Sequence, residues 1–200
     1  MNRQELFRHV WQIESDEILR LSDEYDVKMT NRLIDVLLWA KDNGHRIFTA
    51  GVGTSAAAAK KIAHSFCCIE FSATFLSPGD SVHGGLGAVQ NEDVAILISK
   101  GGATKEITNM LSCLKKKHVI IVGVTESLDS ILGKECDILI PLHVSREPDD
   151  FNMLATASTL KVVAYFDAVI ILLMSESGYT KEQFAIIHPG GAVGDRLLRL

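Results

Sequence analysis

Two short loops rich in glycine and hydroxyl side chains are the segments of this sequence best suited to bind an anion. Gly51-Val-Gly-Thr-Ser55 and Ser99-Lys-Gly-Gly-Ala-Thr104 each lie between a β-prone run and a helix-prone segment. Glycine lets the backbone approach a ligand closely, and the free N–H groups of a helix N-terminus attract negative charge. Two such loops on neighbouring strands can cradle one phosphate dianion with neutral donors. The candidate phosphate-binding residues are Gly53, Thr54, Ser55, Ser99, Lys100, Gly101, Gly102 and Thr104.

Neither loop matches a nucleotide-binding motif. The first is too short for a Walker A loop and lacks its Lys-Ser/Thr ending, and Ala56 stands where a dinucleotide fingerprint has its third glycine. An ordinary turn between strand and helix is the alternative interpretation of the first loop, and a plain N-cap is the alternative for Thr104. Lys100 adds an optional positive charge.

Four titratable side chains are candidates for acid–base chemistry. His83 lies in a glycine-rich loop, and His188 stands beside a proline and two glycines. Glu106 falls in the first turn of a predicted helix, and Glu147 follows the last β-prone run. Each also fits a plain structural role. His83 fits a surface histidine, and His188 fits an ordinary turn. Glu106 fits a surface acid favoured by the helix dipole, and Glu147 fits a loop acid paired with Arg146.

The order of the elements predicts an open, doubly wound α/β fold. Strands that alternate with helices at this spacing indicate a parallel five-stranded sheet flanked by helices in three layers, as in flavodoxin-like folds. Ligands of such folds bind at the carboxyl ends of the strands, where the loops described above lie. We expect strands at residues 46–50, 71–76, 93–99, 119–124 and 137–141, and a long apolar helix over 151–175.

The first 43 residues predict a helical hairpin. Apolar residues recur at helical spacing over residues 3–22, and a second helix is expected between Thr30 as its N-cap and Gly44. This segment holds 6 basic and 9 acidic side chains, a balance that disfavours a DNA-reading arm. We expect the hairpin to pack on its own subunit or between subunits, within a single domain that spans residues 1–200.

Composition excludes several classes of protein. The chain has 20 basic and 25 acidic residues, a net charge of −5, so nucleic acid is not an expected partner. The four cysteines form no C-x-x-C pair, which predicts reduced core residues in a cytosolic protein. The charged N-terminus does not resemble a signal peptide, and the apolar run 162–174 is broken by Asp167 and too short to span a bilayer. We therefore expect a cytoplasmic protein with no membrane partner.

Together, these motifs resemble the sugar isomerase (SIS) domain of arabinose-5-phosphate isomerases. The likeness covers nearly the whole chain from about residue 30, and its most specific part is the His-Pro-Gly-Gly-Ala-x-Gly run near the C-terminus. The residues that carry it are 51–55, 83–87, 98–106, 145–147, 156–159 with Asp167, and 184–198.

The resemblance implies aldose–ketose isomerisation of a sugar phosphate, D-arabinose 5-phosphate with D-ribulose 5-phosphate. This chemistry requires no metal and we expect no cofactor, while a divalent ion bound by His83 and His188 is the alternative. It also implies a homotetramer with active sites at subunit interfaces. His83, Glu106, Glu147 and His188 match the family's functional positions. Its phosphate-binding hydroxyls fall on Ser55, Ser99 and Thr104, with Thr156 and Ser158 as further candidates.

The sequence departs from the family in two loops. Thr54 stands where the family carries an active-site lysine, and Gly101 replaces a phosphate-binding hydroxyl, while Lys100 brings a new charge nearby. Lys100 is therefore a candidate replacement for the missing lysine. Many members continue into a pair of CBS domains, and since this chain stops after the SIS domain, we expect that regulation to be absent or to lie elsewhere.

An enediol mechanism needs a base for the proton on C2 and a proton shuttle between O1 and O2. Glu147 or Glu106 is the expected base, with His188 and His83 for ring opening and oxygen protonation. The alternative is a non-catalytic sugar-phosphate sensor, which the missing lysine favours and the four retained acid–base residues oppose. A third possibility is an isomerase for a hexulose phosphate, and a DNA-binding SIS regulator is the least favoured.

Overall fold

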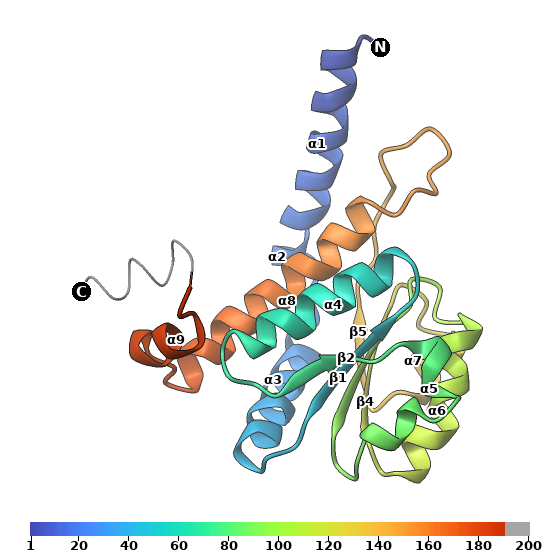
Figure 1. Cartoon of the computed structure of the whole chain (residues 1–200). Helices are drawn as coiled ribbons and strands as arrows, with labels where there is room; N and C mark the ends of the chain where they lie inside the picture. The colour runs from blue at the N-terminus through green and yellow to red at the C-terminus, as the bar shows by residue number, and fades with distance from the viewer. Residues whose placement is uncertain (191–200) are drawn as a thin grey trace.

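The computed structural model describes residues 1–190, which form three layers around a parallel sheet (Figure 1). The strands are β1 (Ile47–Gly51), β2 (Ala73–Phe75), β3 (Val94–Ile98), β4 (Ile120–Thr125) and β5 (Ile138–Pro141). The helices are α1 (Arg3–Leu19), α2 (Leu21–Glu24), α3 (Val27–Asp42), α4 (Thr54–Cys67), α5 (Pro78–Ser81), α6 (Lys105–Lys116), α7 (Ile131–Glu135), α8 (Ala157–Glu176) and α9 (Lys181–Ile187), with a 3-10 turn η1 (Gly85–Ala88).

The sheet confirms the predicted doubly wound topology. Its five strands are all parallel and lie in the order β2-β1-β3-β4-β5, each within two residues of its expected bounds. Every residue of β1 and β3 is buried, because helices cover both faces of the sheet. The register aligns the carboxyl ends of the central strands: Ile98 pairs with Gly51 on one side and with Val124 on the other.

Alternation along the strands divides the core into two clusters. Ile96 and Ile98 of β3 point into a cluster formed with α3, α4 and α8, whereas Ala95 and Leu97 point into a cluster formed with α6, α7 and η1. Figure 1 shows the corresponding layers, with α3, α4 and α8 on one side of the sheet and α5, α6 and α7 on the other. Because α4 follows β1 and α6 follows β3, the N-terminal ends of these two helices lie near the carboxyl ends of the central strands.

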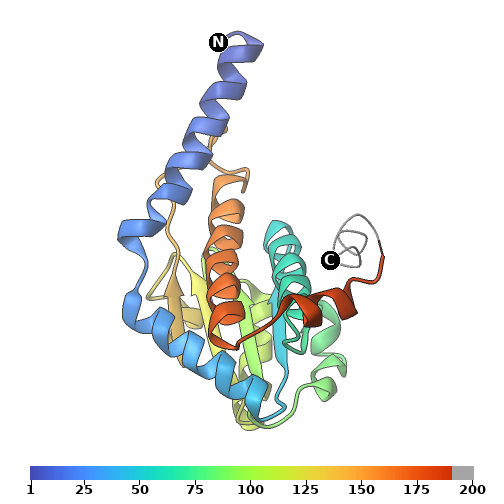
Figure 2. The same cartoon turned by 90° about the vertical axis from the view of Figure 1, so that its left-hand side faces the viewer.

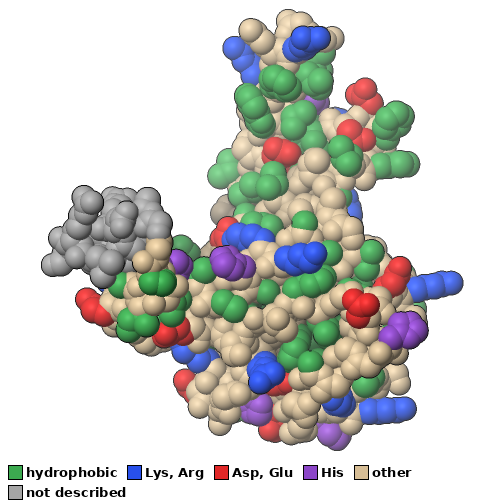
Figure 3. Space-filling model, viewed as in Figure 1, with side chains coloured by type: hydrophobic (Ala, Val, Ile, Leu, Met, Phe, Trp, Pro, Cys, Tyr) green, Lys and Arg blue, Asp and Glu red, His purple; other side chains and the backbone are tan. Residues whose placement is uncertain are grey.

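The N-terminal helices differ from the expected hairpin. Asp26, and not Thr30, caps α3, and the Thr30 hydroxyl lies inside the helix at 2.8 Å from the Tyr165 hydroxyl of α8. The short α2 separates α1 from α3, and α1 projects away from the body of the molecule instead of lying along α3 (Figures 1 and 2). Figure 3 shows hydrophobic side chains along this projecting helix, where Phe7 and Trp11 are exposed.

Two buried charges fix the base of α1. Glu17 is 2% exposed and accepts hydrogen bonds from the Ser145 backbone N–H at 3.0 Å and from its hydroxyl. Lys161 of α8, 1% exposed, donates to Glu24 at 2.9 Å and to the His143 carbonyl at 2.7 Å, and its Nζ lies 3.5 Å from Glu17 Oε2. These contacts tie α1 and α2 to the segment that follows β5.

The long apolar helix starts later than predicted, at Ala157 instead of residue 151. The Asp149 carboxylate accepts the backbone N–H groups of Phe151, Met153 and Leu154, and these bonds hold residues 149–154 in a loop. By length and composition α8 could cross a membrane, which corrects the expectation that this apolar segment is too short. However, its Tyr165 and Phe166 are buried against the sheet, as in the core helix of a globular protein.

The cysteines only partly match their prediction. All four are free thiols, but none is a fully buried core residue: Cys67 is exposed, and Cys68, Cys113 and Cys136 are half-buried. Cys67 and Cys68 lie at the C-terminal end of α4, and Cys113 and Cys136 pack against the core cluster formed with α6, α7 and η1 without being fully enclosed by it.

Candidate functional site

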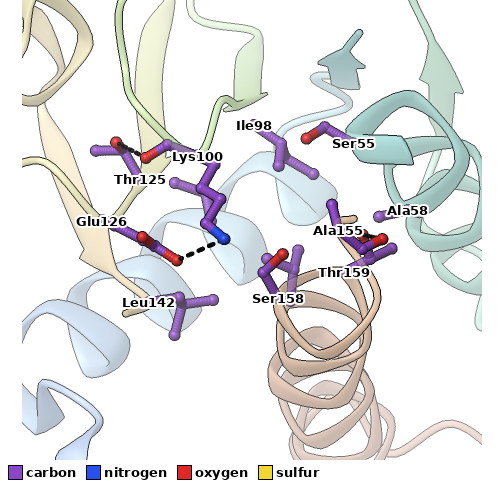
Figure 4. Close-up of a pocket in the computed structure, with 12 residues that line it drawn as sticks. Ser55, Ala58, Ile98, Lys100, Thr125, Glu126, Leu142, Ala155, Ser158 and Thr159 are labelled. Atoms are coloured by element: carbon purple, nitrogen blue, oxygen red, sulfur yellow. Dashed lines mark hydrogen bonds and ion pairs between the residues drawn. The ribbon is translucent and has the colours of Figure 1, made fainter. Parts of the chain in front are cut away.

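A cavity lined by both polar and apolar side chains lies at the carboxyl ends of the strands, between the N-terminal ends of α4 and α8 (Figure 4). The strand order reverses between β1 and β3, and ligands of open α/β sheets bind at such a switch point. The polar side chains of its lining are Ser55, Lys100, Thr125, Glu126, Ser158 and Thr159. The cavity thus lies at the edge of the sheet where the sequence places the two candidate loops.

The first glycine loop leaves the N-terminus of α4 open. Gly53 has φ 61° and ψ −128°, a conformation that residues with a Cβ rarely adopt, and it turns the chain from β1 into the helix. Within residues 1–190 no side chain caps α4. The backbone N–H groups of Ala56 and Ala57 donate to the Gly53 carbonyl, so those of Thr54 and Ser55 are the first-turn donors available to a ligand. Ser55 lines the cavity, while Gly53 and Thr54 are exposed beside it.

The second loop is held by packing and by paired hydroxyls. Ser99 is buried, and its Oγ lies 2.9 Å from Thr104 Oγ1, so Thr104 stands at the N-cap of α6 without bonding a helix N–H. Gly102 has φ 65°, and a Cβ there would lie 1.9 Å from Ser130 Oγ. Gly102 is thus required by close packing, whereas Gly101 is exposed next to Lys100.

Lys100 places an ammonium group between two carboxylates. Its Nζ donates to Glu147 Oε1 at 2.7 Å and lies 3.7 Å from Glu126 Oε1. Its carbonyl accepts the Thr125 hydroxyl and the Glu126 backbone N–H, both at 2.9 Å, so β3 and β4 fix the backbone at this point. The first glycine loop has no cationic side chain, and Lys100 of the second loop places a cation at the same cavity.

Glu147 is fully buried and fully bonded. Its carboxylate accepts hydrogen bonds from Lys100, from the backbone N–H groups of Thr156 at 3.0 Å and Ser158 at 3.3 Å, and from the Ser158 hydroxyl. Burial by itself raises the pKa of this carboxyl, but the bonds from Lys100 and Ser158 outweigh it and hold the pKa below its usual range. Glu147 therefore caps α8 as an ionised group.

The Glu147 carboxylate does not pair with Arg146, which was the structural alternative considered from the sequence. Arg146 donates to the main-chain carbonyl of Glu147 at 3.4 Å and not to the carboxylate, which Lys100 occupies instead. Asn152 also accepts the Glu147 backbone N–H at 2.6 Å.

Glu126 is a site residue that the sequence did not single out. It directly follows β4, lines the cavity, and has a side chain that is 19% exposed. Burial raises the pKa of Glu126, and the nearby charge of Lys100 only partly opposes this effect. The sequence position of Glu126 could have identified it as a site residue, because an acid immediately after a strand of a parallel sheet lies at the ligand-binding edge.

A single chain does not assemble the four acid–base candidates. His83 and Glu106 are exposed and lie outside the lining of the cavity. His188 follows α9, beyond the C-terminal end of α8, and stacks on Phe184 at 3.9 Å between ring centroids. Because α8 is 20 residues, or about 30 Å, long, His188 lies at the opposite end from the cavity (Figure 1). The part of the expected C-terminal motif beyond residue 190 lies outside the described residues.

The two further hydroxyl candidates take different places at the start of α8. Ser158 lines the cavity and bonds Glu147. Thr156 lies instead beside a second, more apolar hollow between α1 and the loop 148–154, and its buried hydroxyl has no hydrogen-bond partner among the described residues. For the part of the chain that the structure describes, no group of three or more His, Cys, Asp or Glu side chains could hold a metal ion.

A doubly wound sheet with glycine and hydroxyl loops at its switch point is the architecture of a ligand-binding α/β domain. Residues 42–174 match the family model described as the SIS domain. The chain belongs to the SIS domain family. It is 31% identical to arabinose 5-phosphate isomerase KdsD of Escherichia coli K12 over 195 residues. That match covers 98% of this chain and 58% of the relative, so the chain spans little more than half of the relative's length.

Solved structures agree with this assignment. A crystal structure from Listeria monocytogenes, named as a candidate sugar-phosphate isomerase, is 48% identical, has a TM-score of 0.90, and matches over 95% of this chain and 100% of that one. The structure of c3406 from Escherichia coli CFT073 in complex with arabinose 5-phosphate is 30% identical, has a TM-score of 0.88, and matches over 94% of this chain and 100% of that one.

Proposed function

We propose that this protein is a cytoplasmic phosphosugar isomerase that interconverts an aldose phosphate and a ketose phosphate through an enediol. The observation that carries the proposal is the cavity at the switch point, where Lys100 stands between two carboxylates and beside the hydroxyls of Ser55 and Ser158. The match to KdsD and to the sugar-phosphate complex of c3406 favours arabinose 5-phosphate and ribulose 5-phosphate as the first substrates to test.

The phosphate is assigned to the neutral donors of the two loops. The open N-terminus of α4 supplies N–H groups, Ser55 supplies a hydroxyl, and the Ser99–Thr104 pair lies across the switch point on the next strand. Since Glu147 neutralises the Lys100 ammonium, these donors and not Lys100 carry the dianion. The lysine then faces the oxygen atoms of the reacting end of the sugar.

The reaction moves one carbon-bound proton. A base removes the proton from C2 of the open-chain aldose, the electron pair forms the C1–C2 double bond, and O1 takes up a proton. Return of a proton to C1 and loss of the proton from O2 give the ketose, so nothing is consumed overall. This route uses a base and a proton shuttle, for which side chains are sufficient without a cofactor.

The positions of His83, Glu106 and His188 support a site that is completed by another copy of the chain, in a homo-oligomer. These residues belong to the expected acid–base set but lie outside the cavity of their own chain. We assign His83 and His188 to ring opening and oxygen protonation.

The test is conversion of arabinose 5-phosphate, followed by separation of aldose and ketose phosphates, for the wild type and for the His83→Ala and His188→Ala variants. Both variants are expected to lose most of their turnover while they still bind the sugar phosphate. Full activity in both would reject their roles. Binding without conversion of any pentose or hexose phosphate by the wild type would favour a sugar-phosphate sensor.

A further inference from the structure

The carboxylates of Glu147 and Glu126 both lie beside Lys100, and they differ in the number of acceptor positions that remain free for a substrate. The oxygen atoms of Glu147 already accept four hydrogen bonds, from Lys100, Thr156 and twice from Ser158, and the side chain is 0% exposed. A carboxylate has about four acceptor positions. Glu147 is therefore saturated, and its geometry is that of a positioning residue for Lys100 and α8.

Glu126 has unused acceptor capacity and faces the cavity. Its Oε1 accepts the Val144 backbone N–H at 3.3 Å and lies 3.7 Å from Lys100 Nζ. Its Oε2 lies 3.8 Å from His143 Nδ1, beyond hydrogen-bond distance, and has no hydrogen-bond donor among the described residues. Figure 4 shows Glu126 and Lys100 on one wall of the cavity and Ser158 and Thr159 of α8 on the other.

We infer that Glu126 is the base that transfers the proton between C1 and C2 of the bound sugar, a deepening that rests on the proposed isomerase function. The C2–H bond breaks and its proton goes to the Glu126 carboxylate. The C2 electron pair forms the C1–C2 double bond, and the carbonyl electrons move to O1, next to the Lys100 ammonium. Glu126 then returns its proton to C1, and the proton on O2 ends on O1.

The local electrostatics fit this role. The groups that face Glu126 are Lys100 from the end of β3 and His143 and Glu147 from the segment after β5. A base works best when its pKa approaches the working pH. Burial raises the pKa of Glu126 toward that pH, whereas the hydrogen bonds to Glu147 lower the pKa of Glu147 away from it. The carbonyl oxygen that becomes O1 needs a nearby positive group, which Lys100 provides.

The experiment compares the wild type with Glu126→Gln, which keeps the size of the side chain and an oxygen for the Val144 N–H. With arabinose 5-phosphate in D2O, solvent deuterium entry at C2 is expected to fall by about 100-fold or more in Glu126→Gln. Binding of the same sugar phosphate, measured by calorimetry, is expected to change by less than about threefold. Glu135→Gln is the matched control, because Glu135 is an exposed acid on α7 that pairs with Lys115, and it is expected to behave as wild type.

Two outcomes would overturn the assignment while leaving the isomerase proposal in place. One is a Glu126→Gln variant that keeps more than about a tenth of the wild-type exchange rate. The other is loss of binding with unchanged turnover at saturation, which would make Glu126 a binding or positioning residue. By contrast, a wild-type protein that neither exchanges a proton on any sugar phosphate nor converts one would reject the proposed function itself, and the role of Glu126 with it.

Discussion

At the scale of single residues, the site depends on one cation that holds a buried acid. Replacing Lys100 by Met leaves the ionised Glu147 without its charged donor, and a buried charge without a partner is costly. Since Lys100 is itself 41% exposed, we expect a moderate loss, about 1–3 kcal/mol in the free energy of unfolding. Urea unfolding at pH 7 measures it. Lys134→Met is the control, because within residues 1–190 Lys134 pairs only with the exposed Asp129, and an equal loss there would contradict the prediction.

The same pair gives stability a defined pH dependence. The folded-state pKa of Glu147 lies below its ordinary value of 4.5, so its stabilisation is present above that pH and is lost as the pH falls through the folded pKa. We expect urea midpoints of the wild type to drop below pH 4.5, and the drop to be smaller in Lys100→Met. Identical pH profiles for the two proteins would show that Lys100 does not hold this carboxyl ionised.

Gly102 and Gly101 are neighbours with opposite tolerance for a side chain. A Cβ at Gly102 would lie 1.9 Å from Ser130 Oγ on a backbone with φ 65°, whereas a Cβ at Gly101 meets no atom within 4 Å. Gly102→Ala is therefore expected to cost about 2–3 kcal/mol, and Gly101→Ala less than about 0.5 kcal/mol. Thermal unfolding measures both, at roughly 2–4 °C per kcal/mol for a chain of this size. Equal melting temperatures would contradict the packing of the second loop.

At the scale of the elements, α1 is held by charges buried at its base. Lys161→Met removes the buried cation beside Glu17 and Glu24. It leaves them only the half-exposed Arg20, although Ser145 still donates to Glu17. We expect about 3 kcal/mol less stability and faster amide hydrogen exchange throughout α1. Lys61→Met removes an exposed pair with Asp167 of α8 and is expected to change neither. Unchanged exchange in α1 of Lys161→Met would mean that apolar contacts alone hold it.

The elements also show what the sequence could predict. Strand positions followed from short apolar runs that end in glycine or hydroxyl residues, as in the segment before Ser99, and the structure confirms them. The start of α8 could not be predicted from the sequence, because residues 151–154 have an apolar, helix-like pattern. In the structure the Asp149 carboxylate accepts three backbone N–H groups of this stretch and holds it in a loop. The Lys100–Glu147 pair was also missed, since its partners lie 47 residues apart. Local pattern predicts elements, whereas such pairs depend on the strand order.

At the scale of the whole molecule, the proposal that another copy of the chain completes the site makes a direct prediction. If His188 of one copy completes the cavity that contains Glu126 of another, two inactive variants can restore activity together. Co-refolding His188→Ala with Glu126→Gln should produce wild-type sites at about a quarter of positions, because each site draws its two residues from different chains. Turnover of the mixture is the measurement. A mixture as inactive as its components would contradict a shared site.

Enediol formation on a bound sugar phosphate can be observed by proton NMR of the wild type in D2O. The protein is incubated with a panel of pentose and hexose phosphates, and deuterium entry at C1 and C2 is followed even where net conversion is small. We predict exchange with arabinose 5-phosphate and ribulose 5-phosphate. Exchange with another sugar alone would keep the chemistry and change the substrate. Neither exchange nor conversion with any sugar, at concentrations where binding is demonstrated in the same tube, would contradict the isomerase function.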